Sequence, residues 1–251
     1  MNLTSIEWAT HCHNIMTGCL NRELGICNVD ACYARQTAEN PFYRKAFPYG
    51  FKPHFYEGRI HQVAKLRTPA IIFMDSMSDT FGSWWTDEEI LKVLHIMDNY
   101  RGVHWHKYVV LTKNPARMAV ILSDYVPRNY LENVYFGTSV SGDVREAGRI
   151  LSLQVTHGLG FKTVLSMEPL LNDPTRMLDA AGNINWLDWL IIGGQTKPTI
   201  EPKIEWLMEI GRVVDHQPVF IKKNAGLCDQ TWLTKQFPAD LLPIAKAWGK
   251  A

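Results

Sequence analysis

Three of the five cysteines lie close together near the N-terminus, at Cys19, Cys27 and Cys32, with the spacing C-x7-C-x4-C. Thiolates are soft ligands that suit iron–sulfur clusters and zinc. Three of them leave one position of a four-coordinate centre open, which a catalytic site needs and a closed structural site does not. Our leading hypothesis is therefore a [4Fe–4S] cluster on these cysteines, with its fourth iron free to bind another molecule.

Two alternatives remain open for the same cysteines: a zinc site completed by Cys12, His11 or His13, and thiols that bind no metal. Zinc sites usually pair their cysteines in C-x2–4-C motifs, which this spacing fits poorly. We expect Cys12 and Cys228 to lie in the core or beside the ligands, because free cysteine is among the most buried residue types.

The bulk composition is that of an ordinary soluble globular protein, with 251 residues, of which 46% are hydrophobic and 20% charged. The formal net charge of +1 argues neither for nor against a nucleic-acid partner, so any polyanion site has to be a local patch. No apolar run is long enough to span a bilayer, and the N-terminus lacks the basic start and apolar core of a signal peptide. These features predict a cytoplasmic protein without a membrane partner, in a compartment where thiols stay reduced.

Short apolar runs alternate with helix-like segments through most of the chain. Their hydrophobicity is continuous, which is typical of strands buried on both faces of a parallel sheet. The six runs are 69–74, 107–111, 133–137, 161–166, 189–193 and 217–221, and a further strand is expected before Cys19. Helix starts lie between the runs, as in the capping box Thr86-Asp87-Glu88-Glu89, which precedes an amphipathic stretch.

This alternation predicts an α/β fold with a right-handed series of βα units. We expect a TIM-barrel-like βα barrel of parallel strands, complete or partial, that forms a single domain over residues 1–251. The alternative is a doubly wound sheet, which is weakened because no G-x-G-x-x-G motif follows any of the strands.

Polar residues and glycines collect directly after the predicted strands. In βα architectures the functional site lies at the carboxyl ends of the strands. The residues in question are Ser76, Asp79, Lys113, Thr138, Ser139, Glu168, Gly193, Gly194 and the run Lys222-Lys223-Asn224. We therefore expect one rim of the protein to carry the site.

The cysteine region resembles a stretched form of the signature of radical S-adenosylmethionine (SAM) enzymes related to spore photoproduct lyase. The residues that carry this likeness are Gly18-Cys19, Gly25-Ile26-Cys27 and Cys32-Tyr33-Ala34-Arg35. Typical radical SAM enzymes use C-x3-C-x2-C, so both gaps are longer here.

Other segments resemble a phage- and bacteria-encoded three-cysteine family of unknown function placed near those enzymes. They are Ile6-Glu7-Trp8, Met74-Asp75-Ser76-Met77-Ser78-Asp79, Val110-Leu111-Thr112-Lys113-Asn114-Pro115-Ala116-Arg117-Met118, Leu165-Ser166-Met167-Glu168-Pro169-Leu170-Leu171 and Asp188-Trp189-Leu190-Ile191-Ile192-Gly193-Gly194.

The resemblance implies a TIM-barrel-like fold, a [4Fe–4S] cluster on Cys19, Cys27 and Cys32, and SAM bound at the open iron. It further implies a radical SAM-type enzyme, in which the cluster passes one electron to SAM and a 5′-deoxyadenosyl radical abstracts hydrogen from substrate. Such an enzyme needs an electron donor as a partner. The substrate is unknown, and kinship makes a nucleic acid or nucleotide the best guess.

SAM carries an amino acid head and a ribose, so its site needs carboxylates, hydroxyls and backbone amides. Residues of the right type are Ser76, Asp79, Thr138, Ser139, Gly193 and Gly194, with Glu168 for the ribose or the substrate and Lys113 for a carboxylate or phosphate. We expect Tyr33 to pack over the cluster as an aromatic lid. The alternatives are that Asp79 caps a loop and that Glu168 pairs with a lysine on the rim.

The segment 40–65 interleaves aromatic and basic side chains. This pattern indicates either a nucleic-acid or nucleotide surface or an excursion that packs over the cluster.

Two functions compete with the radical SAM hypothesis. The first is a non-catalytic module whose metal, zinc or iron–sulfur, stabilises a loop that docks a protein or nucleic acid. The second is a zinc-dependent hydrolase that uses the same cysteines.

Overall fold

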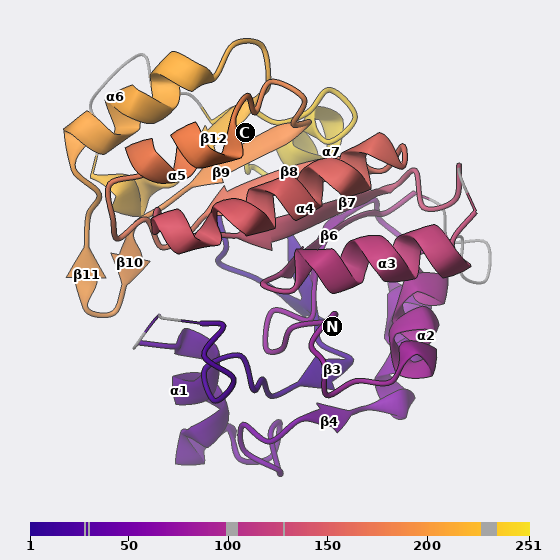
Figure 1. Cartoon of the computed structure of the whole chain (residues 1–251). Coiled ribbons are helices and arrows are strands. Elements are labelled where there is room, and N and C mark those ends of the chain that lie inside the picture. Colours follow the sequence, from indigo (N-terminus) through magenta and orange to yellow (C-terminus); the bar gives the residue numbers. More distant parts are fainter. Residues whose placement is uncertain (28, 30, 99–104, 128, 227–234) are drawn as a thin grey trace.

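The computed structural model describes residues 1–27, 29, 31–98, 105–127, 129–226 and 235–251, so Cys228 lies outside the described residues. Its centre is a sheet of eight strands in the same order in space as in the chain (Figure 1). The strands are β1 (Asn2–Leu3), β2 (His11–His13), β5 (Ile71–Met74), β6 (Lys107–Thr112), β7 (Val134–Ser139), β8 (Lys162–Met167), β9 (Trp189–Ile192) and β12 (Val219–Ile221). All neighbours pair in parallel except β1 and β2, which are antiparallel.

The strands are buried on both faces, as their continuous hydrophobicity predicts. Successive residues point to opposite faces of a strand. In β5, Ile72 and Met74 belong to the core on one side of the sheet, whereas Ile71 belongs to the core on the other. The predicted α/β fold with parallel strands is therefore confirmed, and all six predicted runs contain strands.

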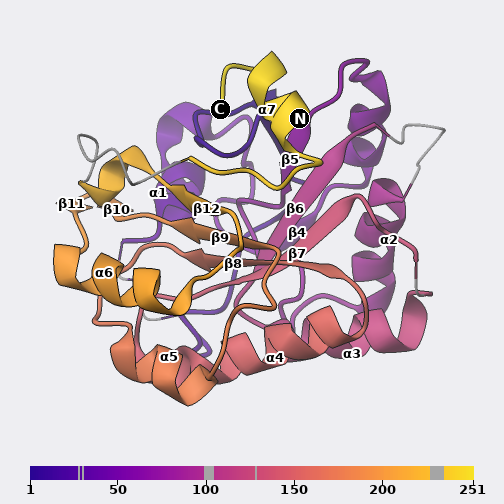
Figure 2. The same cartoon turned by 90° about the horizontal axis from the view of Figure 1, so that it is seen from above.

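Helices cover the two faces of the sheet unequally. Figure 2 shows α3 to α6 side by side along one face and α7 on the other. The helices are α2 (Asp87–Met97), α3 (Pro115–Tyr125), α4 (Ala147–Gly158), α5 (Thr175–Ala181), α6 (Ile204–Val213) and α7 (Leu242–Ala247). The α7 face is filled by Trp8, Trp189 and Phe237, whose rings pack against one another.

The sheet is open in the part of the chain that the structure describes. Its edges are β1 and β12, and they do not pair with each other. The outer edge of β12 instead meets Lys235 through an antiparallel bridge at Phe220. A complete barrel, one of the two forms expected from the sequence, is therefore not present among the described residues.

The capping box at Thr86 is confirmed and starts α2. The Thr86 hydroxyl accepts the backbone N–H of Glu89 at 3.2 Å, and the Glu89 carboxylate accepts the backbone N–H of Thr86 at 2.9 Å. The helix α4 ends at Gly158, and the left-handed residue that turns the chain after it is Gly160, with φ of +96°. No described helix is long and apolar enough to cross a membrane.

The long segment between β2 and β5 lies below the sheet in Figure 1. It contains the antiparallel pair β3 (Met16–Thr17) and β4 (His54–Phe55), the helix α1 (Tyr33–Glu39) and the 3-10 turns Pro41–Tyr43 and Glu57–Lys65. The short hairpin of β10 (Gln195–Thr196) and β11 (Thr199–Ile200) follows β9 and points to the same side. The cysteines therefore lie on the carboxyl side of the parallel strands.

Candidate functional site

The first cysteine is held at the end of β5 by hydrogen bonds to the residue before it. The Gly18 N–H donates to the Met77 carbonyl at 2.9 Å, and the Ser78 hydroxyl donates to the Gly18 carbonyl at 2.6 Å. Gly18 has φ of +80°, and a Cβ at this position would lie 2.4 Å from the carbonyl of Lys52. Only glycine fits both constraints, so the chain fixes where Cys19 enters the site.

The gap between the first two cysteines is closed by Asn21, which is 2% exposed. Its carbonyl accepts the backbone N–H groups of Ile26 (2.8 Å) and Cys27 (3.0 Å). Its side-chain amide donates to Asp79 at 2.6 Å and accepts from Asn114 at 3.0 Å. The extra residues of the C-x7-C spacing thus form a hydrogen-bonded loop tied to the ends of β5 and β6.

Asp79 is the acceptor at the centre of this arrangement and is 3% exposed. Its carboxylate accepts five hydrogen bonds, from the side chains of Asn21 (2.6 Å), Asn114 (3.0 Å) and Thr112 (2.5 Å) and the backbone N–H groups of Phe81 (3.1 Å) and Lys113 (2.8 Å). A carboxylate offers about four lone-pair sites. In this structure its acceptor capacity is filled by the protein itself.

Arg149, a half-buried arginine in α4, ties the cysteine loop to β7. The Arg149 guanidinium donates to the carbonyls of Ile26 and Ser139, and it pairs with Glu146 at 2.6 Å. Glu146 is 5% exposed and also accepts the backbone N–H and hydroxyl of Ser141. Cys27 therefore follows a residue whose carbonyl is anchored at the end of β7.

Among the described residues, the sulfurs of Cys19 and Cys32 accept backbone N–H groups. Cys32 is the N-cap of α1, and its sulfur accepts from Arg35 at 3.5 Å. The sulfur of Cys19 accepts from Asn21 at the same distance. Hydrogen bonds to sulfur are one of the means by which a protein sets the potential of an iron–sulfur cluster.

The thiols of Cys27 and Cys32 both lie within electrostatic reach of Cys19. Burial raises the pKa of Cys19 to about 12, and the charges of Asp79, Cys32 and Cys27 contribute to this rise. Without a cation nearby, the Cys19 thiol therefore keeps its proton at neutral pH. Metal binding would have to release that proton, as thiolate ligation generally does.

The three cysteine thiols are ligands of the type that binds an iron–sulfur cluster. The described residues do not form a closed site for a single metal ion. The described cysteines, Cys12, Cys19, Cys27 and Cys32, are all free of disulfides. Among the described residues, no three His, Cys, Asp or Glu side chains are arranged to hold one metal ion. In a cubane cluster each cysteine binds a different iron, so the sulfurs need not converge on one point.

The histidines of the zinc alternative are already engaged elsewhere. His13 is fully buried and its Nε2 lies 2.9 Å from the carbonyl of Arg59. His11 is buried with its ring edge-on to Trp248 at 5.0 Å, and its Nδ1 bonds the Thr10 hydroxyl at 2.9 Å. Nδ1 of His13 has no hydrogen-bond partner, but neither histidine belongs to a group of three possible metal ligands among the described residues.

Tyr33 lies between the cysteine loop and the end of β5. Its ring is 55% exposed, but its hydroxyl points inward and donates to the carbonyl of Ser76. Burial of this hydroxyl and the nearby charges of Cys12 and Cys32 raise the pKa of Tyr33 above its ordinary value. The structure thus brings two of the predicted cofactor residues, Tyr33 and Ser76, into contact.

The predicted residues at the ends of β6 and β7 differ in what their side chains do. Thr138 is fully buried and its hydroxyl donates to the carbonyl of Thr112 at 2.8 Å. Lys113 and Ser139 are half-buried, and within the described ranges no partner binds the Lys113 ammonium or the Ser139 hydroxyl. Lys113 and Ser139 therefore keep polar groups available at this rim, whereas Thr138 does not.

Glu168 pairs with a lysine on the rim, which was one of the two expectations for it. Its carboxylate lies 2.6 Å from the Lys222 ammonium, and it also accepts the indole N–H of Trp8 at 3.3 Å. The side chains of Glu168 and Lys222 are 16% and 18% exposed. This half-buried pair joins the ends of β8 and β12.

The two glycines after β9 are required by this packing. A Cβ at Gly193 would lie 2.7 Å from the Glu168 carboxylate, and a Cβ at Gly194 would lie 2.4 Å from the carbonyl of Asn224. The Asn224 side chain also donates to the Gly194 carbonyl at 2.6 Å. Close approach of protein groups therefore explains both glycines, whatever ligand the rim binds.

The family described as "Protein of unknown function (DUF5131)" matches residues 3–236, which is most of the chain. The chain belongs to this family. Among solved structures, the DUF5131 chain resembles a spore photoproduct lyase double mutant with bound AdoMet and a dinucleoside spore photoproduct. The TM-score is 0.53 and the sequence identity 12%, over 84% of this chain and 62% of the lyase chain, so the likeness concerns the fold. No curated protein matches the sequence.

Sequence reasoning on this DUF5131 chain missed the residues that hold the cysteine loop, namely Asn21, Asn114, Glu146 and Arg149. Arg149 lies 123 positions from its partner Ile26. No spacing rule links positions that far apart, so the sequence held no signal for this contact. The predicted site residues that the structure brings together form two groups. One lies around Asp79 at the cysteine loop, and the other lies around Glu168.

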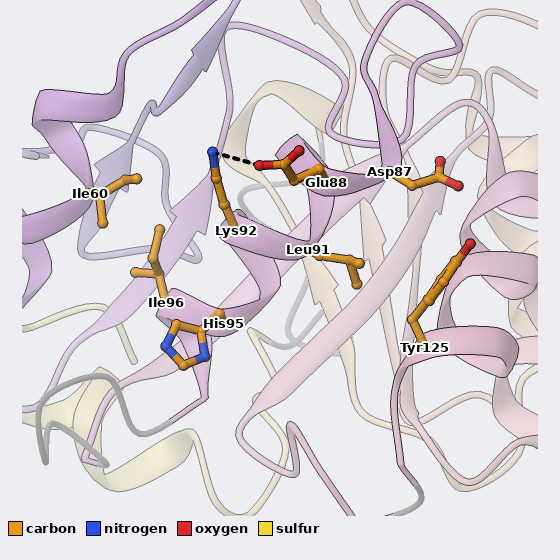
Figure 3. Close-up of a pocket in the computed structure, with 8 residues that line it drawn as sticks. All are labelled: Ile60, Asp87, Glu88, Leu91, Lys92, His95, Ile96 and Tyr125. Atoms are coloured by element: carbon orange, nitrogen blue, oxygen red, sulfur yellow. Dashed lines mark ion pairs between the residues drawn. The ribbon is translucent and has the colours of Figure 1, made fainter.

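An open hollow in the described part of the DUF5131 chain lies away from these residues. It has a volume of about 520 Å³ and is lined by Ile60, Asp87, Glu88, Leu91, Lys92, His95, Ile96 and Tyr125 (Figure 3). None of these residues belongs to the cysteine loop or to the end of a sheet strand. The hollow is lined mainly by the outer surface of α2, where Lys92 and Glu88 form a surface ion pair at 3.1 Å.

Proposed function

We propose that this DUF5131 chain is a radical SAM-type iron–sulfur enzyme, in which Cys19, Cys27 and Cys32 hold a [4Fe–4S] cluster and SAM binds at its open iron. One observation carries the proposal. Three free thiols share a single hydrogen-bonded loop on the carboxyl side of a parallel sheet, in a fold similar to that of a protein that binds AdoMet. The open sheet would then be a partial barrel, and residues 1–251 a single domain.

When bound, the cluster and SAM together supply a one-electron cleavage that lets hydrogen be abstracted from an unreactive carbon. The protein's own contribution begins with the thiolates. The backbone N–H groups of Asn21 and Arg35 point at the sulfurs of Cys19 and Cys32 and would stabilise their negative charge. Arg149 and Asn21 hold the loop in place before any ligand arrives.

We assign the predicted cofactor residues to two roles, positioning of the site and contact with SAM. Asp79 and Thr138 are assigned to positioning, because both side chains are buried and hydrogen-bonded inside the protein. Tyr33, Ser76, Lys113, Ser139, Glu168, Gly193 and Gly194 remain our candidates for contact with SAM. Lys113 is suited to the SAM carboxylate, because its ammonium is a donor with no described partner.

The first test is metal content after anaerobic purification. We expect a brown protein with about four irons and matching sulfide per chain, and loss of iron from the Cys19→Ala, Cys27→Ala and Cys32→Ala variants. Cys12→Ala is the matched control, because Cys12 lies in β2 outside the loop and should keep the iron. A colourless protein with one zinc, or equal iron in all four variants, would contradict the proposal.

The second test is cleavage of SAM by the reduced, iron-loaded protein. We expect release of 5′-deoxyadenosine when a chemical reductant replaces the natural electron donor. A protein that retains its iron but releases no 5′-deoxyadenosine would instead be a non-catalytic binding module, and the enzyme proposal would fail.

A further inference from the structure

An exposed surface of aromatic and basic side chains lies directly beside the cysteine loop. Residues 41–56 contain seven Phe or Tyr residues, three Lys or Arg residues, and no Asp or Glu. We call the outward-facing members the aromatic–basic surface; they are Phe42, Tyr43, Arg44, Lys45, Tyr49 and Lys52, all of which are exposed. The rest of the chain is close to neutral, so this is a local concentration of positive charge.

The segment is anchored by its other aromatic side chains, which face inward. Phe51 is 8% exposed, and Phe47 packs with it in a small cluster that includes Cys19 and Cys32. This part of the segment packs beside the cysteines, as one of the two expectations proposed. The anchoring leaves the outward rings on a fixed base.

The outward rings are more exposed than packing requires. Phe42 is 84% exposed and Tyr49 is 53% exposed. Tyr49 is stacked on His54 with ring centroids 4.0 Å apart and an interplanar angle of 28°. One face of Tyr49 is thereby covered and its orientation fixed, while the ring remains accessible from outside.

The cations of this surface are available for an external partner. Arg44, Lys45 and Lys52 form no ion pair with any carboxylate that the structure describes. In contrast, the neighbouring Arg35 is paired with Glu23. A set of exposed cations without carboxylate partners favours a polyanion over a neutral ligand.

The surface is continuous with the proposed site. The carbonyl of Lys52 lies against Gly18, the residue before Cys19. The strand β4, which follows Lys52, pairs with β3, which leads into Gly18. A ligand bound along this surface would therefore run toward the cysteine loop.

We propose that the aromatic–basic surface binds single-stranded nucleic acid, with bases stacked on Phe42 and Tyr49 and phosphates beside the cations. Aromatic rings stack on any base with an exposed face, and a base in a duplex offers no such face. An anionic membrane would also meet the positive charge, but it would not need a ring fixed in orientation by a second ring. If the proposed function is correct, single-stranded nucleic acid is also the class of its substrate. Only this link to the substrate rests on the proposed function, because binding itself requires no cluster.

The test is fluorescence anisotropy with labelled oligo-dT and oligo-rU of about 15 nucleotides, the upper range of single-strand sites. Full-length protein is used in both iron-loaded and chelator-treated forms. Phe42→Ala and Tyr49→Ala should each weaken binding by about 5- to 150-fold, the equivalent of about 1–3 kcal/mol of stacking per base. Lys45→Glu and Lys52→Glu should each lower the salt dependence, by roughly 0.7 in the logarithmic slope per lost phosphate contact.

Matched controls come from other exposed positions. Tyr125→Ala removes a ring that is 53% exposed at the end of α3, and Lys246→Glu reverses an exposed charge on α7. Both controls should bind as the unmodified chain does. Circular dichroism checks that every variant is folded. We expect all of them to fold, because the substituted side chains are exposed.

Binding of either oligonucleotide, with loss in the four surface variants only, supports the proposal. Absence of binding, equal effects in the controls, or tighter binding to a duplex would overturn it. Binding to vesicles of anionic phospholipid with the same variant dependence, and not to oligonucleotides, would assign the surface to a membrane instead. If oligonucleotides bind but the protein holds no iron, the surface stands and the proposed function fails.

Discussion

Asp75 offers a sharp test of how this fold treats a buried charge. The carboxyl is 2% exposed at the end of β5, and burial raises its pKa to about 7. The opposing influences are smaller: backbone N–H groups of Met16 and Ile15, the Thr80 hydroxyl, and the charge of Arg59. The folded protein therefore holds the Asp75 proton more tightly than the unfolded chain does.

The consequence for stability follows from linkage. A carboxyl whose pKa is raised on folding contributes stability that is fully present below the unfolded pKa near 4 and is lost as pH rises through about 7. A difference of about three pH units corresponds to an upper value of about 4 kcal/mol. Asp75→Asn should remove this loss, because the amide resembles the protonated carboxyl.

The substitution should also be tolerated locally. The Asn Oδ1 can accept the same N–H groups of Ile15 and Met16, at present 2.8 and 2.9 Å from the carboxylate, and its amide can donate to the Thr80 hydroxyl. Asp75 has φ of +48°, a conformation that Asn adopts readily. Asp75→Ala is the contrasting variant, since it leaves the buried N–H groups without an acceptor and should destabilise at every pH.

The assay is urea unfolding followed by circular dichroism at pH 4 to pH 8, with each protein in the same chelator-treated form. The free energy of unfolding of Asp75→Asn minus that of the unmodified chain should rise by about 1.4 kcal/mol per pH unit between about pH 4 and pH 7, and should level off above pH 7. The comparison uses the difference between the two proteins because His13 and His106 also titrate in this pH range. Burial lowers the pKa of both histidines to about 4, so they make the free energy of unfolding rise with pH, opposite to the effect of Asp75. A flat difference would show that Asp75 stays ionised and that its hydrogen bonds outweigh burial.

Three further outcomes follow from single contacts. Gly18→Ala should lower iron retention and destabilise the fold by about 1–2 kcal/mol in urea unfolding, whereas Gly148→Ala, in an open position of α4, should stabilise it by about 0.5–1 kcal/mol. Thr86→Ala removes the capping box and should lower the urea midpoint by the equivalent of about 1 kcal/mol, with the slope of the transition unchanged. An unchanged midpoint would contradict a stabilising role of the capping box. Burial alone would raise the pKa of Asp240, but hydrogen bonds from Lys162, Tyr135 and Lys107 hold it at about 2. Asp240→Asn should thus cost about 1–2 kcal/mol above pH 4, a loss that disappears as pH falls toward 2 and that acid titration of both proteins would measure.

The sequence alone determined the features that depend on neighbouring residues. The continuous apolar runs predicted strands buried on both faces, and Ile71 and Ile72 lie in separate cores on the two sides of the sheet. The capping box at Thr86 predicted the start of α2, because its hydrogen bonds join residues three apart. The cysteine spacing likewise identified the loop, since ligand type and spacing are local properties of the chain.

Only the tertiary structure decided which polar side chains remain free to act. Asp79 was a candidate for the cofactor, but its carboxylate is filled by groups from the cysteine loop and the end of β6. Glu168 is bound by Lys222, and Arg149 reaches a carbonyl 123 positions away. Such partners meet only after the strands align, and no local pattern encodes them. Whether the sheet closes depends likewise on its two edges, which are far apart in the chain.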